Sequence, residues 1–295
     1  MSLFRYIFIV VLLGTISCED VIDVDIEEAA GDLVIDAWVD SRNQEQVIRL
    51  TIAQAYFDNI TVPAVEAMVS IHNTNTNQTF DFDYTGFNGI YQWTPIGDQV
   101  LGTEGDLLTL SIDRRNQSYT ATTSINRVPS LDSIGQEFRD NEVFFDDGIY
   151  TEFFARDFEG AGDAYWIKSF KNGVYLDDAN ELNIAYDAGF DAGSRIDGLI
   201  FIPPIRELIN EINEDGLSMP WEPGQEIRVE LHSISIPAFN FLEIARDQIL
   251  NGSNGIFTLP LANARSNISK SDGSPALGFF NVASVSSRSQ VIVDP

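Results

Sequence analysis

The sequence has 295 residues, of which 44% are hydrophobic and 21% charged, which is enough for one large or two ordinary domains. Asp and Glu outnumber Lys and Arg by 45 to 17, giving a formal net charge of −28. A field of this sign repels phosphate backbones and anionic lipid headgroups, which argues against nucleic acid as a partner. The single Cys excludes an internal disulfide and a Cys-based zinc site.

The N-terminus predicts a lipoprotein signal peptide over residues 1–17. It carries one basic residue, Arg5, then an apolar run at residues 6–13 and small residues before Cys18. The apolar run is shorter than the about 20 residues of a membrane-spanning helix. Thr15 to Cys18 resembles a lipobox, with Thr15 where Leu is commonest. We therefore predict a lipid anchor at Cys18, where several acyl chains give stable attachment; a plain secretory signal is the alternative.

Residues 18–30 predict an acidic tether. Six of the ten residues at 19–28 are Asp or Glu, and such charges repel one another and keep the segment extended. Acidic residues directly after a lipidated Cys resemble the export tether of surface lipoproteins from the Bacteroidetes group. The tether therefore predicts an outward-facing protein, and a solvated spacer is the alternative.

Period-two alternation predicts a β-sandwich over residues 31–128. Apolar and polar side chains alternate in several short runs, which is the pattern of strands with one buried face. Turn-forming Gly and Asn residues separate the runs. Seven short antiparallel strands in about a hundred residues favour an immunoglobulin-like sandwich. The strands are predicted at residues 33–39, 47–52, 65–71, 80–84, 90–93, 108–112 and 119–125.

A second β-rich domain is predicted over residues 129–295, after the break at Val128-Pro129-Ser130. Its strands are expected at residues 144–154, 165–170, 227–234 and 277–285. Two short helices are expected near residues 204–215 and 237–251, because a Pro opens each segment, apolar residues follow at helical spacing, and a Gly closes it. The fold is therefore predicted to be mainly β, with both helices packed on the second sheet.

The sequence offers little catalytic chemistry. His72 and His232, the only histidines, are each expected on a polar, solvent-facing strand surface, His232 on the same face as Arg228 and Glu230. Neither begins a zinc-binding His-Glu-x-x-His motif, and a Ser-His-Asp triad would need one of them. No nucleophile-elbow or phosphate-binding loop motif is present. We predict no catalytic residues and no enzymatic activity.

Carboxylates leave two alternatives open. A glycosidase needs only two acids, but among 45 acids no particular pair stands out. Bound calcium is the other alternative, because Asp146-Asp147-Gly148 and residues 187–191 cluster oxygen ligands, although neither has the spacing of a dedicated calcium loop. We predict no cofactor and no metal site. The aromatic residues Trp93, Tyr165, Trp166 and Trp221 could stack on sugar or peptide, but aromatics on alternating strands are usually core.

The chain resembles a Bacteroidetes lipoprotein family of unknown function. The resemblance rests on the order of several short motifs along almost the whole mature chain: residues 18–25, 33–39, 65–69, 89–91, 128–134, 267–269 and 277–282. It implies a cell-envelope lipoprotein with an N-terminal sandwich, of a kind that often accompanies TonB-dependent receptors. The family supplies no catalytic motif, and only the anchor at Cys18 carries over.

Three functions follow as hypotheses. The first is an outer-membrane, surface-exposed accessory subunit that binds ligand for a TonB-dependent uptake system. The second is a structural or adhesive surface lipoprotein, and the third is an envelope hydrolase that uses an Asp/Glu pair. The expected partners are the membrane, through Cys18, and a TonB-dependent receptor, but not nucleic acid.

Overall fold

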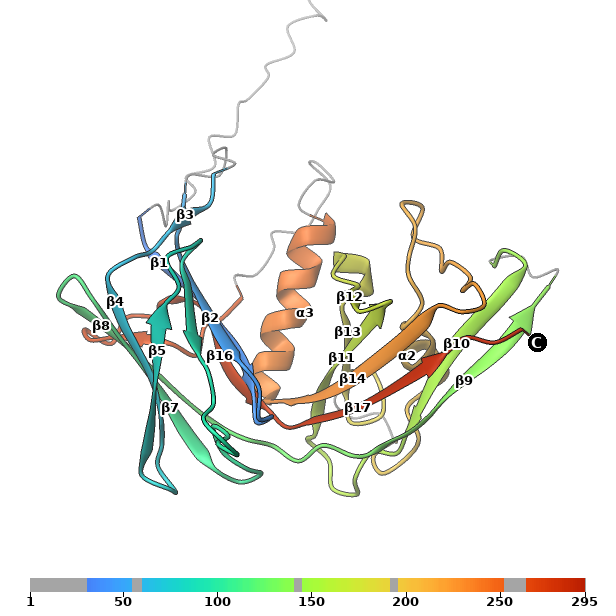
Figure 1. Ribbon diagram of the computed structural model, residues 1–295, viewed down its shortest axis with the longest axis horizontal. Coiled ribbons are helices and arrows are strands. Elements are labelled where there is room, and N and C mark those ends of the chain that lie inside the picture. Colours follow the sequence, from blue (N-terminus) through green and yellow to red (C-terminus); the bar gives the residue numbers. More distant parts are fainter. Residues whose placement is uncertain (1–30, 55–59, 141–144, 192–195, 252–263, 295) are drawn as a thin grey trace, which may run out of the picture.

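A computed structural model describes residues 31–54, 60–140, 145–191, 196–251 and 264–294 (Figure 1). The predicted signal peptide, Cys18 and the whole acidic tether at residues 18–30 lie outside these residues. The fold is mainly β, as predicted, with two β-rich halves side by side and one long helix in the angle between them (Figure 1). No helix in the described part of the chain is long and apolar enough to cross a membrane.

The first half is one large sheet that curls over its own core in a sandwich-like way (Figure 1). Its strand order is β15-β8-β7-β4-β5-β6-β2-β1-β16, and β3 lies beside β2. Alternate residues such as Ile35, Leu50, Ile71 and Leu110 are fully buried in this core, so the period-two prediction is confirmed. The strands are β1 (Leu33–Asp40), β2 (Gln46–Ile52), β3 (Val62–Pro63), β4 (Ala67–Asn73), β5 (Gln78–Tyr84), β6 (Ile90–Trp93), β7 (Leu107–Arg114), β8 (Gln117–Ser124), β15 (Ser269–Lys270) and β16 (Leu277–Ala283).

Two strands from the far end of the sequence complete this sheet. β16 pairs with β1 in parallel, and β15 pairs with β8. The strand expected at residues 277–285 therefore does not stay with the second half. This strand, β16, ends at Ala283, and after Ser284 the chain enters the other sheet as the strand that begins at Val285. An alternating pattern tells which face a residue takes, but it does not identify the neighbouring strand.

The second half contains a sheet of order β12-β11-β14-β17, with β13 against β11, and a separate β9–β10 hairpin. Its own core includes Phe153, Tyr165, Phe201 and Leu231. The β9 strand was not predicted, because polar residues outnumber apolar ones along it and no regular alternation is visible. The elements are β9 (Leu131–Arg139), β10 (Gly148–Ala155), β11 (Ala164–Lys171), β12 (Val174–Tyr175), the 3-10 turn η1 (Ala179–Glu181), β13 (Asn183–Tyr186), β14 (Glu226–Ile234) and β17 (Val285–Val291).

The helix predicted near residues 204–215 is shorter, because α2 covers only Pro203–Glu207. Side-chain amides donate hydrogen bonds to the backbone carbonyls that would have to accept helical hydrogen bonds if the helix were longer. Asn183 Nδ2 donates to the carbonyls of Ile205 and Leu208, at 2.8 and 3.0 Å, and Asn210 Nδ2 donates to the carbonyl of Glu207 at 2.6 Å. Local side-chain bonds of this kind compete with helical bonds.

The helix predicted at residues 237–251 is confirmed as α3 (Ile236–Asn251). Ser235 caps it, since its Oγ accepts from the backbone N–H of Ala238 at 3.2 Å. Ala238, Phe239 and Leu242 are buried against both halves of the molecule, in a third apolar cluster. The helix therefore fills the angle between the two sheets rather than covering the second sheet alone.

Candidate functional site

A small cavity lies where the two sheets meet. We call it the inter-sheet pocket; its volume is about 280 Å³. One side comes from the outer faces of β1 and β16, and the other from β11, β12 and β14. It is lined by Trp38, Val39, Asp40, Arg42, Trp166, Lys168, Phe170, Tyr175, Glu230, His232, Ile234, Asn281 and Ala283.

The floor of the pocket is a network of paired charges. Arg42 binds Asp40 at 2.7 Å and Glu230 at 3.0 Å, so it joins a carboxylate of the first half to one of the second. Glu230 also accepts from Arg228 and, at 2.9 Å, from His232 Nε2. Asp40, Glu230 and His232 are each at most 6% exposed. Both carboxylates are therefore occupied by protein donors.

The surroundings fix the protonation of this network. Burial raises the pKa of Asp40, but the hydrogen bonds and charge of Arg42 outweigh burial and hold that pKa below its ordinary value. Burial, helped by the nearby charge of Lys168, holds the pKa of His232 well below 6.5. His232 is therefore neutral at pH 7 and donates its Nε2 proton to Glu230.

Lys168 is the exception in this network. It lies directly across the β11–β14 ladder from Glu230, yet that carboxylate is turned to Arg42, Arg228 and His232. Among the described residues, no carboxylate oxygen lies within ion-pair distance of Lys168 Nζ. The ammonium instead sits 3.9 Å from the Trp166 ring centroid. Burial lowers its pKa to about 8.

The buried charge network of the pocket does little to stabilise the fold by itself. Buried ion pairs contribute little net stability compared with apolar residues of the same size, because their desolvation offsets their attraction. Titratable groups with perturbed pKa values that gather in a cavity are a common mark of a functional site. The inter-sheet pocket is therefore the best candidate for ligand binding in the described part of the chain.

Of the two histidines, both expected on solvent-facing strand surfaces, only His72 lies on one. His72 does lie on the outer face of β4, where its Nδ1 contacts Thr79 Oγ1 at 3.0 Å. The prediction that His232 is a surface residue is wrong, because it is only 6% exposed. It does share a face with Arg228 and Glu230, but the first half of the molecule covers that face of β14.

The aromatic residues divide between core and pocket. Trp93 and Tyr165 are buried in the cores, as expected for aromatics on alternating strands, and Trp221 is buried there from outside any strand. Trp166 instead lines the inter-sheet pocket and contacts Trp38 edge-on, with ring centroids 5.3 Å apart. The pocket thus has an indole wall from each half of the molecule.

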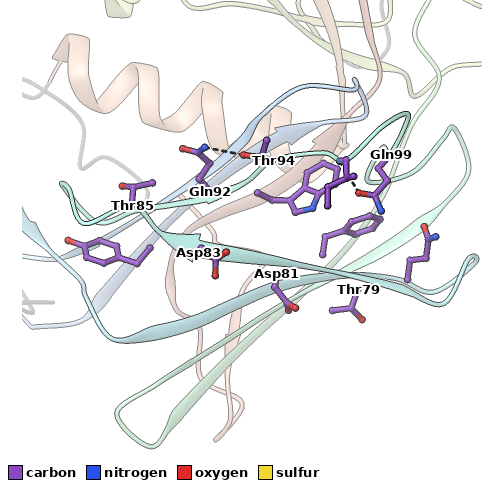
Figure 2. Close-up of a pocket in the computed structure, with 12 residues that line it drawn as sticks. Thr79, Asp81, Asp83, Thr85, Gln92, Thr94 and Gln99 are labelled. Carbon is purple, nitrogen blue, oxygen red and sulfur yellow. Dashed lines mark hydrogen bonds between the residues drawn. The ribbon is translucent and has the colours of Figure 1, made fainter.

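A second hollow, the corner groove, lies where β5 and β6 diverge, with a volume of about 600 Å³. Figure 2 shows Thr79, Asp81 and Asp83 in succession along β5, with Gln92 on the neighbouring β6 and Thr94 directly after that strand. Phe80 and Trp93 are buried beneath the groove, whereas Tyr84 and Ile96 are exposed at its edge. Apart from these two exposed residues, the groove offers hydroxyl, amide and carboxylate groups, which are ordinary on the solvent face of a sheet.

The calcium expectation can be compared with one acidic cluster. Asp187 meets Asp157 and Asp197, with one carboxylate oxygen of each within 4.8 Å of the others. Protein donors already reach all three: Tyr165 O–H donates to Asp157 at 2.6 Å, and backbone N–H groups donate to each residue. Burial raises the pKa of Asp157. The other expected cluster, Asp146-Asp147-Gly148, leads into β10 and does not join this group.

Sequence analysis missed the pocket residues of the first half, Asp40 and Arg42, and it also missed Lys168. A signal was present in the strand patterns. Trp38 and Trp166 lie on faces that alternation assigns to solvent, and a large aromatic on such a face indicates that something covers it. The sequence does not show that the two covered faces meet each other.

Comparison with known proteins gives one result. No curated protein matches the chain. A family model described as a domain of unknown function, DUF4249, matches residues 19–289, which include every strand and helix of the two halves except the end of β17. The chain therefore belongs to the DUF4249 family.

Proposed function

We propose that this protein is an outer-membrane lipoprotein that binds a ligand for a TonB-dependent uptake system. In this proposal acyl chains at Cys18 hold it in the membrane, and the acidic tether at residues 18–30 carries it outward from the surface. The support for the anchor is the N-terminal sequence. The support for the transport partner is the resemblance of the ordered motifs to Bacteroidetes lipoproteins that accompany such receptors.

The observation that carries ligand binding is the inter-sheet pocket. Its charged floor is contributed by both halves, through Asp40 and Arg42 on one side and Glu230 and His232 on the other. A purely structural spacer gains little from such a network, because an apolar junction would be at least as stable. A binding role explains why desolvated charges and two indoles surround a cavity.

The test is co-purification from native membranes. The full chain is extracted with mild detergent, and the proteins that come with it are identified by mass spectrometry. We expect a TonB-dependent receptor in near-equal amount. Cys18→Ser serves as the control, since it should lose both membrane attachment and the receptor while still folding.

Two outcomes would overturn the proposal. Recovery of the anchored chain alone would favour the structural or adhesive function, whose partners are surface polymers or other cells. Hydrolysis of glycans or peptides by the purified chain, lost on substitution of an Asp or Glu, would favour the envelope hydrolase instead.

A further inference from the structure

The chemical groups that remain free in the inter-sheet pocket indicate what it can bind. Glu230 already accepts from Arg42, Arg228 and His232, and Asp40 accepts from Arg42 and from the side chain of Gln46. A cationic ligand would therefore have to displace protein donors from a carboxylate. Such a displacement would break ion pairs of the buried carboxylates Asp40 and Glu230 with partly buried guanidinium groups, which is costly.

Lys168 is the group without a charge partner. Its Nζ lies 3.9 Å from the Trp166 ring centroid and 5.8 Å from that of Tyr175, while Asp36 and Asp40 act on it only through space, without an ion-pair contact among the described residues. A desolvated ammonium gains most from an anion that enters the same cavity, because the low dielectric strengthens the attraction. A protein with only 17 Lys and Arg places two of them, Arg42 and Lys168, in the lining of this one pocket, and Arg228 binds Glu230 of the same lining.

The remaining walls are flat and apolar. Trp38 and Trp166 form an edge-on pair, and Ile234 and Ala283 close the pocket beside them. A volume of about 280 Å³ lies just below the roughly 300–1,000 Å³ typical of small-molecule sites. The pocket therefore fits a small molecule and is too small for a polymer segment.

We propose that the inter-sheet pocket binds a small organic monoanion, a carboxylate with a flat or apolar body, whose negative end pairs with Lys168. The body would lie against the indoles of Trp38 and Trp166. This inference rests on the proposed ligand-binding function and specifies its ligand class.

The experiment uses three probes of the same shape and different charge. Benzoate, benzamide and benzylamine are titrated into the detergent-solubilised full chain, and tryptophan fluorescence reports contact with Trp38 and Trp166. We expect saturable binding of benzoate alone. Lys168→Met should weaken it by roughly thirtyfold or more, as expected for one partner of a desolvated charge pair, and Lys168→Arg should restore most of it. Asp81→Asn, in the corner groove, is the matched control and should leave binding unchanged.

The pH dependence separates a charge role from a packing role. Benzoate binding should weaken as the pH rises through about 8, where Lys168 loses its proton, and this dependence should vanish in Lys168→Arg. The other titratable or charged groups that face Lys168 from neighbouring elements are Asp36, Asp40, Arg42, Tyr175, Arg228, Glu230 and His232. The pKa values of Asp40 and His232 are lowered and that of Tyr175 is raised, so these three groups titrate farther from pH 8 than they do when free in water.

The result separates failure of this inference from failure of the proposed function. Equal binding of benzamide and benzoate, or benzoate binding that Lys168→Met leaves intact, would overturn the ligand class. If a receptor still co-purified with the chain, the uptake function would stand and only the ligand class would be wrong. Loss of benzoate binding in Asp81→Asn would move the site to the corner groove and would also overturn the inference.

Discussion

Replacement of Arg42 with Met is expected to lower the free energy of unfolding by about 3 kcal/mol or more. The reason is that Arg42 is the shared partner of Asp40 and Glu230, which lie in different halves and are both buried. Loss of the guanidinium leaves the buried carboxylate of Asp40 without its ion-pair partner. Urea unfolding at pH 7, followed by tryptophan fluorescence, measures the change.

The loss should depend on pH in a defined direction. The pKa of Asp40 is lowered in the folded protein, so its contribution is present above its ordinary value of 3.8 and is lost as the pH falls through the folded pKa. The gap between wild type and Arg42→Met should therefore be largest near pH 7 and should narrow below about pH 4. Arg288→Met, on the exposed face of β17, is the matched control, with an expected change within about 0.5 kcal/mol. An equal loss in both variants would contradict the account.

Replacement of Gly278 with Ala is expected to destabilise the protein by about 4 kcal/mol, because backbone strain adds to overpacking. Gly278 lies opposite Ile35 in the parallel β1–β16 ladder and has a φ of +97°, which favours glycine. A Cβ there would overlap the carbonyl oxygen of Ile35. The substitution therefore strains the backbone at residue 278 and also pushes β16 away from β1, the strand through which β16 joins the first sheet.

Gly173→Ala separates the two causes. Gly173 has a φ of +84° in the turn between β11 and β12, but its Cβ would meet nothing within 4 Å. We expect a loss of only about 1 kcal/mol there, from backbone strain alone. Urea unfolding of both variants gives the comparison. A loss at Gly278 no greater than that at Gly173 would show that β16 does not pack on β1 as described.

The strands of the first half could be predicted because each buries one face. β1, β7 and β8 have clear alternation of buried and more exposed side chains, and their predicted positions agree with the structure to within one or two residues. The parallel pairing of β1 with β16 could not be predicted, because about 240 residues separate the paired positions and alternation carries no information about partners.

The candidate site was harder to predict for the same reason. Arg228, Glu230 and His232 were correctly placed on one face of β14, but the face was assigned to solvent. Its cover comes from Trp38 and Asp40, on a strand almost 200 residues earlier in the sequence. α2 shows the local limit of prediction, since its apolar spacing was helical while the amides of Asn183 and Asn210 took its carbonyls.

Ligand binding at the inter-sheet pocket is the central claim, and an experimental structure of the full chain purified from its own membranes tests it most directly. We expect a small molecule in the pocket, with its negative end at Lys168 and its body against Trp38 and Trp166. A bound molecule in the corner groove, with the inter-sheet pocket closed by side chains or filled only by water, would contradict the claim.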